Sequence, residues 1–121
     1  MLDNAEVHMA FQEAAAQIEV AGNAVGRYVI MPDHMHVFLR IGINGRLSVA
    51  VKCWKEFITK RLHQTHPGLK VWQPGFFDHL LRSVENYSEK WAYVRENPVR
   101  QGLVMAADLW PYQGEVSIIR W

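Results

Sequence analysis

Apolar residues in the first part of the chain recur with a helical period. Over residues 4–20 the spacings between them are four, three and four, which places these side chains on one face of a helix. They are Val7, Phe11, Ala14 and Ile18. Asn4 or Asp3 is suited to cap the first turn, because a short polar side chain can accept from its exposed N–H groups. A helix over 4–20 is therefore predicted, with Gly22 and Gly26 ending it.

The next two segments have the composition of strands. Residues 27–31 and 34–41 are rich in β-branched, aromatic and other apolar side chains, which favour extended structure. Pro32 and Asp33 lie between them, and this pair is typical of a turn, because proline pre-sets its backbone angle and aspartate hydrogen-bonds back to the chain. We expect a hairpin, although the pattern leaves open whether the chain turns or only kinks at Pro32.

Two further helices and one strand are predicted in the rest of the chain. Residues 47–63 have a second amphipathic pattern, with charged side chains opposite an apolar face. A strand is expected near residues 76–80, followed by a helix over 84–97 that Pro98 breaks or redirects. The tail, residues 107–121, carries aromatic side chains that are expected to pack on the body of the domain.

The order of the predicted elements is helix, strand, strand, helix, strand, helix. This order nearly matches the split βαβ plan of a ferredoxin-like domain, except that the opening strand is missing. We therefore predict an α+β fold, with a ferredoxin-like antiparallel sheet and helices on one face. The length of 121 residues predicts a single domain over 1–121.

Composition excludes several classes of protein. With 21% charged and 12% aromatic residues, the chain is typical of globular domains and not of disordered or collagen-like sequences. No apolar run approaches the ~20 residues of a membrane span, and the first ten residues are acidic where a signal peptide is basic. Cys53 is the single cysteine, which excludes an internal disulfide and a multi-thiolate metal site. A cytoplasmic location is expected.

Positive charge is concentrated in the middle of the chain. Residues 46–82 hold seven basic and two acidic side chains, whereas the segments before and after are net negative. Such a cluster can bind a phosphate backbone, or it can be the solvated face of an amphipathic helix. The basic side chains that could track a phosphate backbone are Lys52, Lys55, Lys60, Arg61 and Arg82.

Two histidines alternate on the second predicted strand. His34 and His36 are separated by Met35, so both imidazoles project from one face and can reach one point, while Met35 points into the core. With oxygen or amide partners, imidazole suits Mn²⁺, Mg²⁺ or related ions. The alternative is a pair of polar side chains on a solvated strand face.

Tyr93 and Asn97 are four residues apart on the third predicted helix. Residues at this spacing lie one above the other, so a phenol and an amide oxygen could face one site as nucleophile and third ligand. Taken singly, a tyrosine such as Tyr93 is more often a half-buried packing residue, and Asn97 before Pro98 is an ordinary residue at the end of a helix.

Four blocks of this sequence together resemble the single-tyrosine HUH transposases, and most closely the REP-associated tyrosine transposases. The blocks are residues 31–39 (MPDHMHVFL), 71–79 (VWQPGFFDH), 85–87 (ENY) and 93–104 (YVRENPVRQGLV). The similarity extends over roughly residues 5–112 in order and spacing. It implies a ferredoxin-like domain that cleaves and rejoins single-stranded DNA with a divalent metal, Mg²⁺ or Mn²⁺.

The resemblance also assigns roles to residues. The HUH pair falls on His34 and His36, the nucleophile on Tyr93 and the third metal ligand on Asn97. Tyr87 is a rival nucleophile of lower rank, because it lies six residues earlier and points elsewhere on the helix. Trp72 is a candidate for stacking on a base, although a packing role is the more usual fate of a tryptophan.

Members of the resembled family usually begin with a strand before the first helix. Without that strand, two strand edges would be exposed to pairing with another chain, so we expect a homodimer or other self-association. Single-stranded or hairpin DNA is the expected partner, and no membrane is expected. Two other hypotheses remain: an inactive or domesticated module of the same fold that binds DNA hairpins without cutting, and an unrelated protein with an incidental histidine pair.

Overall fold

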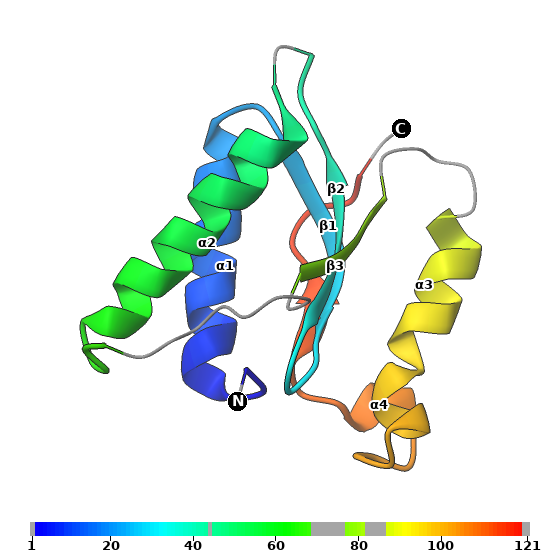
Figure 1. Cartoon of the computed structure of the whole chain (residues 1–121). Coiled ribbons are helices and arrows are strands. Elements are labelled where there is room, and N and C mark those ends of the chain that lie inside the picture. Colours follow the sequence, from blue (N-terminus) through cyan, green and yellow to red (C-terminus); the bar gives the residue numbers. More distant parts are fainter. Residues whose placement is uncertain (1, 44, 69–76, 82–86, 120–121) are drawn as a thin grey trace.

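The computed structural model describes residues 2–43, 45–68, 77–81 and 87–119, with backbone alone for 77–81. Helices and strands are interspersed along this chain (Figure 1). In order they are α1 (Ala5–Val20), β1 (Ala24–Ile30), β2 (Met35–Arg40), α2 (Leu47–His63), β3 (Phe77–Leu81), α3 (Tyr87–Arg95), α4 (Asn97–Arg100), a 3₁₀ turn (Ala107–Leu109) and β4 (Gln113–Glu115). The described helices include none long and apolar enough to cross a membrane.

The sheet has the strand order β3-β2-β1-β4. β1 pairs antiparallel with both β2 and β4, whereas β2 pairs in parallel with β3. The α+β class is therefore confirmed, with a mixed sheet in place of a wholly antiparallel one. No strand precedes α1 within the described residues, in agreement with the predicted element order.

The predicted hairpin is present, and the chain turns at Pro32. Ile30 is paired with Met35 across the two strands, and the Met31 amide donates to the His34 carbonyl at 2.7 Å. The Pro32 carbonyl accepts from the Leu2 amide at 2.8 Å, so the segment before α1 is attached to this turn. The turn fixes where the histidine-bearing strand begins.

The main core lies between the sheet and the helices α1 and α2. Phe11 of α1 packs against Tyr28 of β1 and Trp54 of α2, with ring centroids 4.2 and 4.6 Å apart. All three side chains are at least 99% buried, and full burial of a large apolar side chain contributes about 1.5–3 kcal/mol. The periodicity of residues 4–20 and 47–63 thus predicted both helices and their buried faces correctly. Asn4 caps α1 by accepting from the Val7 amide at 2.8 Å.

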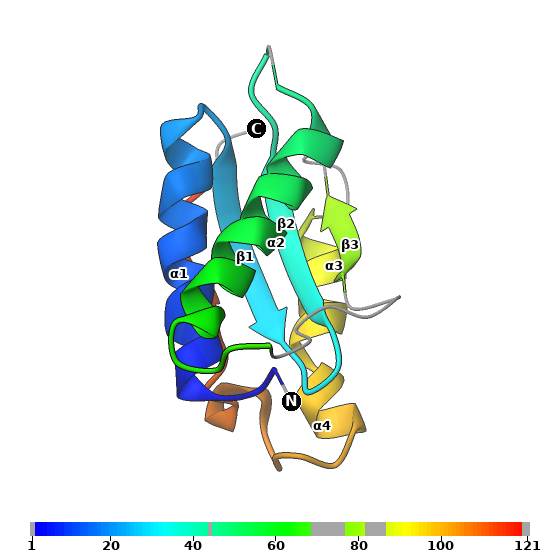
Figure 2. The same cartoon turned by 60° about the vertical axis from the view of Figure 1, so that its left-hand side comes forward.

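A second, smaller core lies on the opposite face of the sheet, under α3. Figures 1 and 2 show α1 and α2 against one face and α3 against the other. The buried members of this cluster are Val29, Met31, Phe38, Val94 and Trp110. β2 is buried on both faces from Met35 to Leu39, and a strand of that kind needs cover on each side. Helices therefore lie on both faces and not on one, as the ferredoxin-like plan had implied.

The third predicted helix is divided in two. α3 ends at Arg95, and α4 begins at Asn97 with Pro98 in its first turn, where proline is tolerated because the N–H that it lacks has no helical partner there. The prediction that Pro98 redirects the helix is confirmed. The predicted helix start at Val84 lies outside the described residues.

The tail packs on the body of the domain, as predicted, and it also supplies a strand that was not predicted. The Trp110 indole Nε1 donates to the Ile30 carbonyl at 3.0 Å, and the Ile30 amide donates to the Tyr112 carbonyl at 2.8 Å. β4 then continues this pairing along β1. The tail thereby closes the edge of the sheet beside β1.

Candidate functional site

His34 and His36 bring their rings together at the start of β2. Met35 between them is completely buried on the α1 and α2 side, so the histidines lie on the face that α3 covers. Their Nε2 atoms are 3.0 Å apart and the rings are nearly perpendicular. His36 is buried, and the His34 side chain is 25% exposed. The alternation that predicted a shared face is therefore observed.

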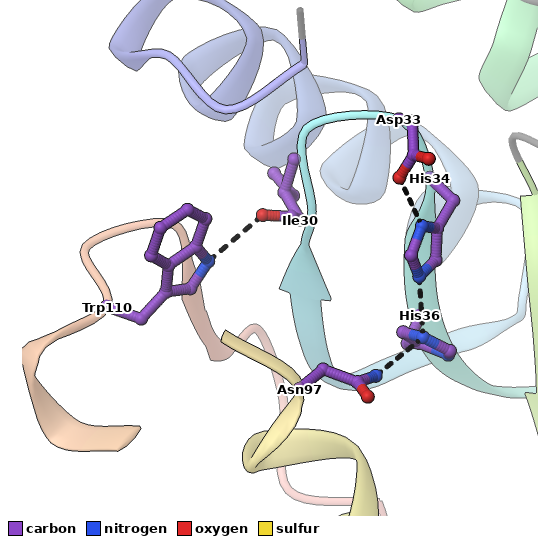
Figure 3. A network of polar contacts seen from close by, with 6 residues as sticks. All are labelled: Ile30, Asp33, His34, His36, Asn97 and Trp110. Carbon is purple, nitrogen blue, oxygen red and sulfur yellow. Dashed lines mark hydrogen bonds and ion pairs between the residues drawn. The ribbon is translucent and has the colours of Figure 1, made fainter. Parts of the chain in front are cut away.

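Asp33 determines which nitrogen of His34 carries the proton. Its Oδ1 is 2.7 Å from His34 Nδ1 (Figure 3). An ionised carboxylate accepts only, so Nδ1 donates and Nε2 keeps its lone pair. The hydrogen bond from His34 in turn lowers the pKa of the Asp33 carboxyl below its ordinary value. In that tautomer the lone pair of His34 Nε2 can bind a cation.

Asn97 reaches the same point from the start of α4. Its Nδ2 donates to His36 Nε2 at 2.8 Å, while its Oδ1 accepts from Arg100 Nη2. A guanidinium can only donate, which fixes the amide with its oxygen toward Arg100 and its nitrogen toward His36. His36 Nε2 is then an acceptor as well, so when both imidazoles are neutral the lone pairs of the two Nε2 atoms face one another.

A cation bound by both Nε2 atoms would stabilise this arrangement, in which two lone pairs point at each other. At metal–nitrogen distances of about 2.1 Å, two ligands at adjacent corners of an octahedron lie about 3.0 Å apart, which matches the distance between the two Nε2 atoms. In the described part of the chain no group of three His, Cys, Asp or Glu side chains could hold an ion. Among the described side chains, the Asn97 amide oxygen could supply a third ligand once the amide has turned over.

Tyr93 lies on α3 and is linked to this cluster through Arg100. The Tyr93 side chain is largely exposed, at 67%. The Arg100 guanidinium carbon lies 4.0 Å from the centre of the Tyr93 ring, and Arg100 Nη2 also donates to the Tyr93 carbonyl at 2.7 Å. One guanidinium thus contacts both the candidate nucleophile and Asn97.

Tyr87, the rival nucleophile, is held in the second core. Its ring packs against Phe38 at 4.9 Å between centroids, and its hydroxyl accepts from the Arg27 amide at 3.3 Å. Burial raises the pKa of the Tyr87 phenol, which makes its nucleophilic form harder to reach. These contacts are those of a packing residue.

The structure separates the basic candidates from the histidine pair. Lys52, Lys55, Lys60 and Arg61 lie on α2, which packs on the face opposite to α3 (Figure 2). Arg61 forms an ion pair with Glu13 of α1 at 3.0 Å. Lys52 and Lys55 line a groove at the start of α2 together with Arg46. Arg82 and Trp72 lie outside the described residues.

Two residues of the site, Asp33 and Arg100, were not predicted to act there. Asp33 was assigned only to the turn, although a carboxylate next to a candidate ligand histidine is a common orienting partner. Arg100 lies three residues after Asn97 and seven after Tyr93. That helical spacing was a signal that could have placed it on the same face.

The chain is similar in sequence to known transposases. Residues 3–97 match the family described as IS200-like transposases. The chain is 30% identical over 89 residues to a REP-associated tyrosine transposase of Escherichia coli K12, an alignment covering 73% of this chain and 52% of that protein. It is 27% identical over 94 residues to a putative REP-associated tyrosine transposase of Haemophilus influenzae, covering 69% and 53%.

The chain spans about half the length of these curated relatives. No solved structure matches it significantly. The family match covers the histidine pair, Tyr93 and Asn97, and confirms the resemblance inferred from the four sequence blocks. The chain belongs to the IS200-like transposase family.

Proposed function

We propose that this chain is the DNA-cleaving domain of a transposase that cuts and rejoins single-stranded DNA through Tyr93. The observation that carries the proposal is the convergence of His34, His36 and Asn97 on one point, with Tyr93 joined to them by Arg100. Family membership and similarity to REP-associated tyrosine transposases support it.

Cleavage begins when the Tyr93 oxygen attacks the scissile phosphorus. The bond from phosphorus to the 3′ oxygen breaks, the phenol gives up its proton to solvent, and the 3′ oxygen takes a proton to become a hydroxyl. A Mg²⁺ or Mn²⁺ ion held by His34, His36 and Asn97 would neutralise a non-bridging phosphate oxygen. The product is a 5′-phosphotyrosine with a free 3′ hydroxyl.

Rejoining is the reverse of this displacement. A 3′ hydroxyl attacks the phosphotyrosine, and the Tyr93 oxygen leaves as a phenolate. Because a phenol is more acidic than an alcohol, with a pKa of about 10, it is the better leaving group and the strand is resealed without ATP. A covalent intermediate of this kind suits strand transfer better than hydrolysis.

The basic residues of α2 lie away from the histidine pair, so we propose that they bind DNA at a different place from the cleaved phosphate. Lys52, Lys55 and Lys60 lie on the other face of the sheet, so we assign them to flanking or hairpin DNA and not to the cleaved phosphate. Arg61 and Arg82 remain candidate DNA-binding residues. A homodimer remains a prediction. Within the described chain, however, β1 and β2 pair with β4 and β3 along the edges that the dimer was expected to cover.

Covalent capture of DNA tests the proposed function. The protein is incubated with end-labelled single-stranded oligonucleotides, with and without hairpins, in Mn²⁺ or Mg²⁺, and denaturing gels reveal any adduct. We expect a metal-dependent adduct that Tyr93→Phe abolishes and that the matched variant Tyr87→Phe retains. An adduct that persists in Tyr93→Phe contradicts the proposal. Tight hairpin binding without any adduct would favour a non-cutting module.

A further inference from the structure

Arg100 is placed between two groups that the proposed reaction uses. Its Nη2 donates to both the Asn97 amide oxygen and the Tyr93 carbonyl, and its guanidinium lies on the Tyr93 ring. Arg100 itself is exposed, so these contacts form at the surface where DNA would arrive. A planar cation in this position can bind a phosphate in bidentate fashion.

The contact with Arg100 keeps Asn97 in an orientation that cannot ligate a metal. The amide nitrogen has no lone pair to offer, and it is this nitrogen that faces His36. The oxygen, which is the ligating atom, is turned toward Arg100. Asn97 must therefore turn its amide over before the oxygen can join the two imidazoles, and this rotation breaks its hydrogen bond to Arg100.

We propose that Arg100 is a positioning residue that holds the Asn97 oxygen away from the metal site until an ion binds, and that the released guanidinium then binds the DNA phosphate beside Tyr93. Ion binding removes one acceptor from Arg100, and a phosphate oxygen replaces that acceptor. The contacts to the Tyr93 ring and carbonyl keep the guanidinium in place during the exchange.

The competition between Arg100 and a metal for Asn97 rests on the described hydrogen bonds and on the proposed metal site. The capture of a phosphate rests on the proposed function, because it requires DNA at Tyr93. Reciprocity then requires that metal and DNA each strengthen the binding of the other.

Titration with Mn²⁺ alone, followed by calorimetry, tests the competition for Asn97. Because Arg100→Ala removes a charge-assisted hydrogen bond that opposes ligation, we expect roughly three- to tenfold tighter Mn²⁺ binding than in the unchanged protein. In an Asn97→Ala background the same substitution should give no gain. Arg95→Ala, which removes an equal charge from the nearby end of α3, is the matched control and should leave the affinity unchanged.

Tighter binding cannot result from misfolding, so a gain in Arg100→Ala is informative even if the variant is slightly less stable. Equal or weaker Mn²⁺ binding in Arg100→Ala overturns the inference. So does a gain of the same size in Arg95→Ala or in the Asn97→Ala background, since each would attribute the effect to net charge.

Coupling between metal and DNA tests the capture of a phosphate. The measurement uses Tyr93→Phe protein, which cannot form the covalent bond, and compares Mn²⁺ affinity with and without a single-stranded oligonucleotide. We expect the DNA to strengthen Mn²⁺ binding at least fivefold, and Arg100→Ala to remove most of that gain. Undiminished coupling in Arg100→Ala contradicts phosphate capture. If the Mn²⁺ titrations behave as expected but no adduct ever forms with Tyr93 intact, the proposed function fails while the competition for Asn97 stands.

Discussion

Asp33 and His34 are neighbours in the chain, and the Asp33 carboxylate accepts a hydrogen bond from His34 Nδ1 at 2.7 Å. This bond selects the tautomer with the proton on Nδ1, which leaves the lone pair of His34 Nε2 on the side of His36. Loss of such an orienting partner commonly weakens metal binding 10–100-fold. The turn before β2 therefore prepares the site as well as reversing the chain.

Replacement of Asp33 by alanine is expected to weaken Mn²⁺ binding by roughly 10–100-fold. Asp33→Asn keeps an oxygen that can accept from Nδ1, so its effect should be clearly smaller. Calorimetric titration of both variants measures the difference, and far-ultraviolet circular dichroism checks that each is folded. Equal affinities in the unchanged protein and in Asp33→Ala would mean that this hydrogen bond does not orient His34.

Trp110 connects the tail to β1 through a buried hydrogen bond to the Ile30 carbonyl. Trp110→Phe keeps an aromatic ring but leaves that carbonyl without its donor, so we expect a loss of about 1–3 kcal/mol in the free energy of unfolding. Urea denaturation measures it. Leu109→Ala, at a side chain that is 63% exposed, should change stability by less than about 0.5 kcal/mol. Similar losses in both variants would contradict a specific role for the indole N–H.

Gly114 lets β4 approach the buried Tyr28 ring. A Cβ at this position would lie 2.8 Å from the Tyr28 hydroxyl oxygen, which His8 and Gln12 hold in place. We expect Gly114→Ala to lower stability by about 1–3 kcal/mol through overpacking. The cost should be smaller in a Tyr28→Phe background, where that oxygen is absent. A double-mutant cycle from denaturation curves measures the coupling, and strict additivity would contradict the steric explanation.

His8 should make stability depend on pH. Burial lowers the pKa of its imidazole below the ordinary value of 6.5, so the unfolded chain binds the proton more readily than the folded one. The contribution of His8 is therefore fully present above about pH 6.5 and is lost as the pH falls below it. Urea midpoints of the unchanged protein and His8→Gln between pH 8 and 5 check this. A difference that stays constant across the range would contradict it, because the other histidines are common to both proteins.

The parts of the fold that follow from local pattern were predictable. The helical spacing of residues 4–20 and 47–63, and the turn at Pro32, predicted α1, α2 and the hairpin. The shared face of His34 and His36 follows from strand alternation alone. By contrast, no local spacing shows that Asn97 meets His36, which lies 61 positions earlier, and that expectation came from the family resemblance.

Other features depend on tertiary contacts that a local pattern does not encode. β4 is a short run of Gln113, Gly114 and Glu115 without apolar alternation, and it is a strand because β1 offers it an edge. α3 lies on the far face because Phe38 and Val29 need cover there. The concentration of basic residues on α2 was evident from the sequence. Its distance from the histidine pair was not, because that distance depends on which face of the sheet α2 covers.

The position of β2 has a consequence for how the site responds to partial unfolding. β2 lies between β1 and β3 and is covered on both faces, so its amide protons should be among the slowest in the domain to exchange with solvent. Asn97 belongs to the four-residue α4 at the periphery, where local opening requires little free energy. On warming, the protein should therefore lose the hydrogen bond between Asn97 and His36 before β2 itself unfolds.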